Sequence, residues 1–197
     1  MPKKVRAILE MTSPARIPLE QDIPVINSLD QPSEIKVTLT KGNHGDYFKL
    51  PNLQGATQFK AKKGLNNIKL VFYPDWIGES DAKLVLLNKD TNEHFEYDIK
   101  GVGEEPLAEE EIIVECKVRE AKKVPIKFRL PEGAMRDFEV TFDLPNASGP
   151  EKFSVPYGSE KDYPLVITPA MGGEFTGSVT FTSQDGVYYW YMVTYRS

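Results

Sequence analysis

An internal repeat constrains this chain more than any other feature of its 197 residues. Residues 70–102 align with residues 165–197 without a gap, at an offset of 95, and the two segments are identical at six positions. The apolar positions stay in phase throughout the alignment. Repeat units of solenoid proteins are about 20–50 residues long, so this longer period indicates two duplicated domains. We therefore predict one domain over residues 1–104 and a second over residues 105–197.

Apolar and polar residues alternate along most of the chain, which is the pattern of half-buried β-strands. Ile35, Val37 and Leu39 alternate with polar residues, and turn-forming pairs such as Asp185-Gly186 separate runs of this kind. Many short strands with turns between them are typical of a sandwich or barrel. The predicted fold class is all-β, with two tandem immunoglobulin-like β-sandwiches. The alternation is also clear over residues 95–99, 112–118, 124–130 and 138–144.

A Pro–x–x–x–Gly element lies between two predicted strands in each half, from Pro74 to Gly78 and from Pro169 to Gly173. Proline ends a strand because it has no N–H for the ladder, and glycine allows the positive φ of a turn. Residues 101–106 also combine glycine with proline. We therefore place the domain boundary in this short linker.

Three blocks of the first half carry a family resemblance. They are QDIPVINSLDQPSEIKVTLT (residues 21–40), LVFYPDWIGESDAKLVL (residues 70–86) and YDIKGVG (residues 97–103). Together they resemble the ASH domain, a major-sperm-protein-like immunoglobulin fold named after the abnormal spindle protein and Hydin. The family has an "IP-x-x-N" strand, a Pro–x–x–x–Gly turn and a "G-x-G" strand end. The second half keeps only the Pro169–Gly173 turn, so its membership depends mainly on the repeat.

The resemblance is to the immunoglobulin-like repeats of large cilia- and flagella-associated proteins. It implies a non-catalytic structural or protein-interaction module of an axonemal scaffold in the cytoplasm, at the cilium or flagellum, with a contribution to central apparatus assembly and motility. The implied partners are other axonemal proteins and neighbouring repeats of the same polypeptide. It implies no cofactor and no small-molecule substrate.

The charge distribution argues against nucleic acid and membrane as partners. Residues 1–104 carry 14 basic and 14 acidic side chains, and residues 105–197 carry 10 and 15. Binding to phosphates needs a concentrated basic face, which this balance does not provide. The chain has one cysteine, so it can form no internal disulfide, and we expect a reducing compartment. Residues 1–16 have no apolar signal-peptide core, which agrees with that expectation.

Histidine and cysteine are few and scattered, and among the plentiful carboxylates no pair is marked out for acid/base chemistry. His44 and His94 are the only histidines, and no G-x-S-x-G sequence is present. Cys116 is in phase with Ile112 and Val114, so we expect a buried thiol without a chemical role. One cysteine and two separated histidines do not make a zinc site. We predict no enzyme activity, no metal and no cofactor.

Two groups of residues are candidates for protein contacts. In the gap-free register Phe95, Tyr97 and Ile99 correspond to Trp190, Met192 and Thr194, and both sets are predicted to face the core. The alternate face of the last strand would then be an aromatic stripe, either a partner surface or intramolecular packing. We also expect this strand to be an open edge that could recruit another strand. The stripe consists of Tyr189, Tyr191, Val193 and Tyr195, and the second group is the basic cluster Lys60, Lys62 and Lys63.

Three other functions compete with the scaffold. A cytosolic adaptor of the major-sperm-protein type would bind short acidic peptides, and the three lysines are its only candidate site in the first half. A two-domain pilus-chaperone-like protein would be secreted, which the missing signal peptide disfavours. An enzyme is the last possibility, and it would depend on His44 or His94.

Overall fold

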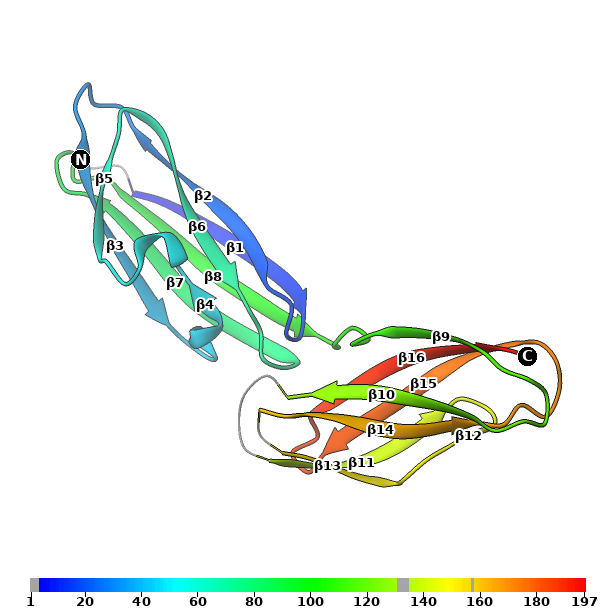
Figure 1. The fold of residues 1–197 in the computed structure, drawn as a ribbon. Helices are drawn as coiled ribbons and strands as arrows, with labels where there is room; N and C mark the ends of the chain where they lie inside the picture. Colours follow the sequence, from blue (N-terminus) through cyan, green and yellow to red (C-terminus); the bar gives the residue numbers. More distant parts are fainter. Residues whose placement is uncertain (1–3, 131–134, 157) are drawn as a thin grey trace. The chain divides into compact units, whose positions relative to one another are not determined.

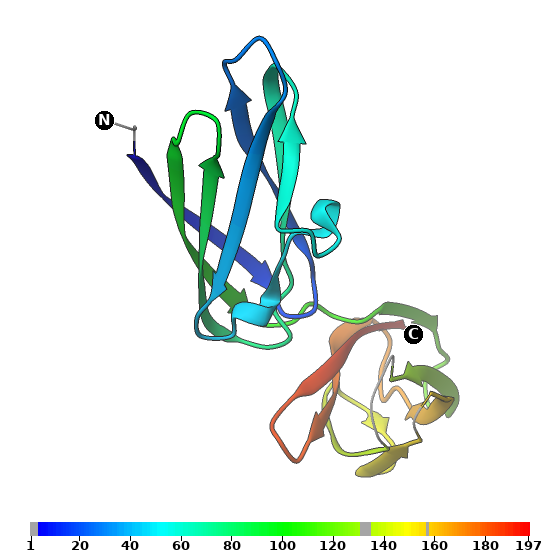
Figure 2. The same cartoon turned by 90° about the vertical axis from the view of Figure 1, so that its left-hand side faces the viewer.

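The computed structural model describes residues 4–130, 135–156 and 158–197. The chain divides into two compact units, Met1–Pro106 and Leu107–Ser197, and each is described here by itself. The boundary that we placed after residue 104 lies at the end of strand β8 (His94–Glu104), two residues before this division. Figures 1 and 2 show each unit as two layers of strands.

The first unit is a β-sandwich of a five-stranded and a three-stranded sheet. Its five-stranded sheet has the order β1 (Lys4–Pro14), β8, β7 (Gly78–Asn88), β3 (Ser33–Lys41) and β5 (Gln58–Ala61). The other sheet has the order β2 (Leu19–Asn27), β6 (Gly64–Phe72) and β4 (Phe48–Lys49). Short 3-10 helices, η1 (Gly45–Tyr47) and η2 (Pro51–Leu53), flank β4. Apolar side chains of the inner faces, such as Phe48 and Phe72, fill the space between the sheets.

The second unit repeats this topology strand for strand, eight strands later in the chain. Its five-stranded sheet has the order β13 (Lys152–Val155), β11 (Arg136–Asp143), β15 (Glu174–Ser183), β16 (Tyr188–Arg196) and β9 (Glu111–Glu115). The smaller sheet has the order β10 (Lys122–Arg129), β14 (Glu160–Ile167) and β12 (Ala147–Ser148). In both units the first strand pairs in parallel with the last. The predicted all-β fold of immunoglobulin-like sandwiches is confirmed.

The Pro–x–x–x–Gly elements form the same turn in both units. Gly78 and Gly173 have φ values of 140° and 141°, which side chains other than hydrogen rarely allow. The carbonyl oxygen of Pro74 accepts a hydrogen bond from the Arg16 N–H at 2.7 Å, and Pro169 accepts one from Arg119 at 2.8 Å. The turn therefore holds the end of the first strand as well as connecting two later ones.

The asparagine of the "IP-x-x-N" block closes loops at one end of the first unit. The Asn27 side chain is buried, and its amide donates to the carbonyl oxygens of Gln31 (2.9 Å) and Ala61 (3.1 Å). Its own oxygen accepts from the Leu29 N–H at 3.0 Å. Extending the strand register by one residue places Leu130 at this position in the second unit, where it is a buried residue of the core.

Candidate interaction surfaces

The predicted aromatic stripe of the last strand faces the core. Tyr191 is 5% exposed, and Val193 and Tyr195 are 0% exposed. All three belong to the core of the second unit, and Tyr189 packs against it. The prediction of an outward-facing stripe is therefore wrong, and the alternative of intramolecular packing describes these four residues.

A hairpin that is one residue shorter in the second unit explains the error. Residues 89–93 connect β7 to β8, whereas residues 184–187 connect β15 to β16. Leu84 pairs with Tyr97, and its counterpart Val179 pairs with Tyr191, so the offset falls from 95 to 94 across this turn. Because side chains alternate with a period of two, a slip of one residue exchanges the two faces of a strand.

A turn residue could have located the missing position. Asn92 and Gly186 both have positive φ, 59° and 84°, and they are 94 residues apart. A gap-free alignment instead places the flexible Gly186 against Thr91, a β-branched residue that disfavours such a conformation. Matching the turn residues before the strands would have given the observed register.

The buried tyrosines of the second unit direct their hydroxyl groups to internal partners. The Tyr191 hydroxyl donates to the Lys127 carbonyl oxygen at 3.3 Å, and the Tyr163 hydroxyl donates to that of Pro150 at 2.7 Å. The Asn146 amide donates to the Tyr195 hydroxyl at 3.1 Å. Asn146-Ala147-Ser148 matches the acceptor sequence for N-glycosylation, and this hydrogen bond engages the Asn146 side chain in an internal contact.

Alkaline pH is expected to destabilise the second unit through these tyrosines. Burial raises the pKa of Tyr163 to about 12, and burial with the nearby Glu109 and Glu110 raises the pKa of Tyr191 well above its usual value. In the unfolded chain both groups lose their protons near pH 10, so the unfolded state binds fewer protons above that pH. The free energy of unfolding should then fall between about pH 10 and 12, by up to about 1.4 kcal/mol per pH unit for each tyrosine.

Thermal unfolding between pH 8 and 11.5 measures this effect. Tyr163→Phe is the matched control, because it keeps the ring and removes the titrating hydroxyl. The variant should be somewhat less stable at neutral pH, since it loses a hydrogen bond worth about 1 kcal/mol. Its loss of stability above pH 10 should be smaller than that of the unchanged chain. Equal alkaline slopes for the two proteins would contradict the assignment.

The outer face of β16 carries the side chains that alternate with the buried ones. Tyr188, Trp190 and Met192 are half-buried there, and Thr194 is bonded to Thr176 of β15, with 2.8 Å between the hydroxyl oxygens. Ile113 of the neighbouring β9 is 57% exposed on the same face. β16 lies between β15 and β9, so the prediction that the last strand is an open edge is also wrong.

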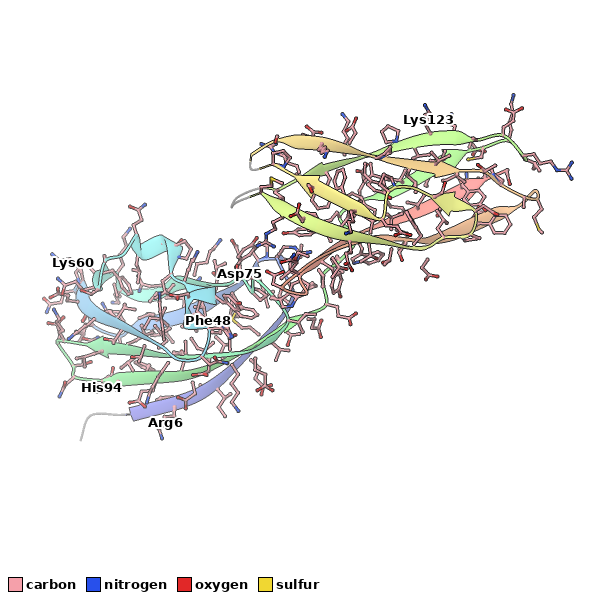
Figure 3. All side chains as sticks on the ribbon, turned by 90° about the horizontal axis from the view of Figure 1, so that it is seen from below. Arg6, Phe48, Lys60, Asp75, His94 and Lys123 are labelled. Carbon is pink, nitrogen blue, oxygen red and sulfur yellow. The ribbon has the colours of Figure 1, made fainter. Side chains whose placement is uncertain are left out.

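The predicted basic cluster lies at one end of the first unit. Lys60 is on β5, Lys62 and Lys63 are in the turn to β6, and all three are exposed (Figure 3 labels Lys60). Asn66 braces the turn, because its oxygen accepts from the Lys62 N–H at 3.0 Å and its amide donates to the Lys62 carbonyl oxygen at 2.8 Å. Lys63 forms an ion pair with Asp30, which offsets part of the positive charge.

The residues considered for catalysis have different surroundings and form no common site. The His44 ring stacks on Tyr47 at 5.3 Å between centroids, in a left-handed turn, and His94 begins β8. Cys116 is only half-buried, not buried as expected, and burial raises the pKa of its thiol. Within residues 4–130, 135–156 and 158–197, no three His, Cys, Asp or Glu side chains gather as ligands of a metal would. The described part of the chain also contains no helix long and apolar enough to cross a membrane.

Solved structures resemble the chain only distantly. An ASH/PapD-like domain of human CEP192 matches 53% of this chain and 84% of its own, at 10% identity and a TM-score of 0.37. Red sea bream transglutaminase matches 93% of this chain and 30% of its own, at 11% identity and a TM-score of 0.48. The fold assignment depends on the strand pairing and not on likenesses of this degree. No protein-family model matches the chain.

Curated proteins give a clearer similarity. Cilia- and flagella-associated protein 47 of human is 30% identical over 178 residues, and its mouse counterpart is 27% identical over 175 residues. The matches cover 90% and 89% of this chain but only 5% of the length of either relative. The resemblance to large cilia- and flagella-associated proteins is thereby confirmed, and the chain is similar over nine-tenths of its length to a segment of cilia- and flagella-associated protein 47.

Proposed function

We propose that this chain is a protein-interaction module of a ciliary or flagellar scaffold, acting in the cytoplasm at the axoneme. The observation that carries the proposal is the similarity to cilia- and flagella-associated protein 47 over both units, at 30% identity. A contribution to assembly of the central apparatus and to motility follows from the same resemblance. The proposed partners are axonemal proteins and neighbouring immunoglobulin-like repeats, and the proposed role needs no catalysis and no cofactor.

The two sandwiches suit such a role because they present broad sheet faces. The outer face of the five-stranded sheet differs between the units in a way that favours different contacts. In the first unit the buried Glu96 pairs with Arg6 at 3.1 Å and with Lys83 at 3.4 Å. In the second unit strand register places Trp190 at the position of Glu96 and Ile113 at the position of Glu10. Apolar and aromatic side chains are enriched in the centres of protein interfaces, so this second face is the proposed contact surface.

Proximity labelling in ciliated cells tests both the location and the surface. The chain fused to a labelling enzyme should label axonemal proteins. A variant with Ile113→Glu and Met192→Glu places two charges on the proposed face and should lose part of that labelling. The matched control carries Lys36→Glu and Thr38→Glu on the outer face of β3 in the first unit, and it should label as the unchanged chain does.

Each variant must keep its circular dichroism spectrum and melting temperature for the comparison to hold. Diffuse cytosolic labelling by the unchanged chain would contradict the ciliary location. Axonemal labelling that both variants retain would contradict the proposed face and leave the location standing.

A further inference from the structure

The first strand of the first unit has an open edge with a self-complementary sequence. β1 has a strand neighbour, β8, on one side only in the part of the chain that the structure describes. Residues 5–8 are all exposed, with Val5 at 36% and Ile8 at 65%. Exposure of consecutive residues means that the opposing sheet does not cover this half of the strand. β1 forms the margin of the first unit in Figure 3, where Arg6 is labelled.

Two other long edges are blocked by proline. Pro24 of β2 lies opposite Asn67, and Pro125 of β10 lies opposite Pro164. A hydrogen-bonded antiparallel pair exchanges both N–H groups, so a proline must occupy a non-bonded pair and direct its nitrogen to the free edge. A further strand would find no donor there. Unlike these, β1 has eleven residues and no proline before its last position.

Side chains on the outer face of β1 carry charges that match in reverse order. Arg6, Ile8 and Glu10 point to this face, as the ion pair of Arg6 with Glu96 shows, while Met11 points to the core. The Arg6 side chain is 63% exposed and uses Nε for that ion pair. Glu10 forms no ion pair within 4.0 Å with any described residue, so its carboxylate is available.

We propose that two copies of this chain associate through β1, antiparallel and centred on Ile8, and join their five-stranded sheets into one. In this register Arg6 of each copy lies opposite Glu10 of the other, and the two Ile8 side chains meet on the two-fold axis. Directly opposed residues in antiparallel strands have Cβ atoms about 4.5–5.5 Å apart, within reach of an ion pair. The association is separate from the proposed ciliary role and stands without it.

The second unit lacks this complementarity at its own first strand. β9 also lies at an edge, and Ile113 at its centre is 57% exposed. Self-pairing centred on Ile113 would place Glu111 opposite Glu115, twice. Like charges directly opposed are destabilising, so β9 serves as the internal control.

Sedimentation of the full 197-residue chain over a wide concentration range tests the association. A reversible dimer is expected, at the weak end of protein–protein affinities because one strand edge buries little area. Ile8→Lys brings two ammonium groups together on the axis and should weaken dimerisation at least about tenfold. Ile113→Lys should leave the dissociation constant unchanged.

Swapping the charges at positions 6 and 10 distinguishes a specific dimer contact from charges that only prevent strand addition at an open edge. Arg6→Glu and Glu10→Arg, each alone, should both be monomeric, because every cross-strand pair becomes repulsive. Mixed in equal amounts they should form a heterodimer, since both pairs are then opposite in charge. The melting temperature of each variant is measured before mixing, so that a folding defect in one of them is distinguished from a loss of association.

Cross-linking reports the register directly. In a Cys116→Ser background, Ile8→Cys should form a covalent dimer with a short bis-maleimide cross-linker, because a two-fold axis through residue 8 brings the two Cβ atoms to within about 5.5 Å of each other. Ile113→Cys in the same background should remain monomeric. A monomer at all concentrations, a dimer indifferent to Ile8→Lys, or a mixture without heterodimer would overturn the proposal and leave the charges of β1 as protection against strand addition.

Discussion

Replacing Tyr195 with alanine is expected to lower the unfolding free energy of the second unit by about 3–5 kcal/mol, a cost typical of deleting a buried aromatic ring. Tyr195 is 0% exposed, and its ring stacks on Phe175 with 5.1 Å between centroids. Its hydroxyl also accepts the Asn146 hydrogen bond. A loss of this size is a large fraction of the about 5–15 kcal/mol that stabilises a typical domain, so the second unit should unfold at a clearly lower temperature.

Hydrogen exchange measured by mass spectrometry localises the effect. Peptides from β14, β15 and β16 should lose protection in Tyr195→Ala, while peptides from the first unit keep theirs. Ile113→Thr is the control on the neighbouring strand, because its side chain is 57% exposed and threonine retains the β-branch. The control should change stability by less than about 0.5 kcal/mol, as exposed positions usually do. Unchanged protection in Tyr195→Ala would mean that the ring is not part of the core.

The alternation of residues was enough to predict the sandwich and much of its core. Ile35 and Val37 are buried as expected, and Ile99 faces inward with Phe95 and Tyr97 packed against the core. These strands have one polar face, so the two possible orientations differ in energy and the pattern distinguishes them. The prediction failed where that contrast disappears.

β16 has apolar or aromatic residues on both faces. Tyr189 and Trp190 are adjacent, as are Tyr191 and Met192, so periodicity cannot tell which face is inward. The register then depended on the alignment, which a single missing loop residue shifted. The open edges of the sheets could not be predicted from the sequence either, because the position of β1 at the edge follows from its pairing with β8, ninety residues later.

The "G-x-G" block has a packing explanation that yields the second large prediction. A Cβ atom on Gly101 would lie 2.5 Å from the Phe72 ring and 2.6 Å from the Ser80 hydroxyl oxygen. Register places Tyr195 at the position of Gly101 in the second unit, and Phe175 at that of Ser80. Ile167 takes the position of Phe72. The first unit therefore fills this region with a ring from β6, and the second fills it with rings from β15 and β16.

Gly101→Ala should destabilise the first unit by roughly 1–3 kcal/mol, because the Phe72 ring is fully buried and can move only by disturbing its stack on Phe48. Phe72→Ile alone should cost a similar amount by leaving a cavity. Together the two changes reproduce part of the arrangement of the second unit, with a smaller β6 side chain making room for a larger β8 side chain. The double variant should be more stable than the sum of the single effects allows, by about 1–2 kcal/mol.

A double-mutant cycle from urea unfolding measures this coupling. Ile68→Val is the matched control, because it shortens another buried side chain of β6 that is not among the nearest atoms to Gly101. Its effect should add to that of Gly101→Ala within about 0.5 kcal/mol. If Phe72→Ile also proved additive, the close approach to the Ser80 hydroxyl, and not the Phe72 ring, would be what requires glycine at this position. Coupling confined to Phe72 would instead show that the two units fill the same region of one fold from different strands. The first unit uses a large side chain of β6, and the second uses large side chains of β15 and β16.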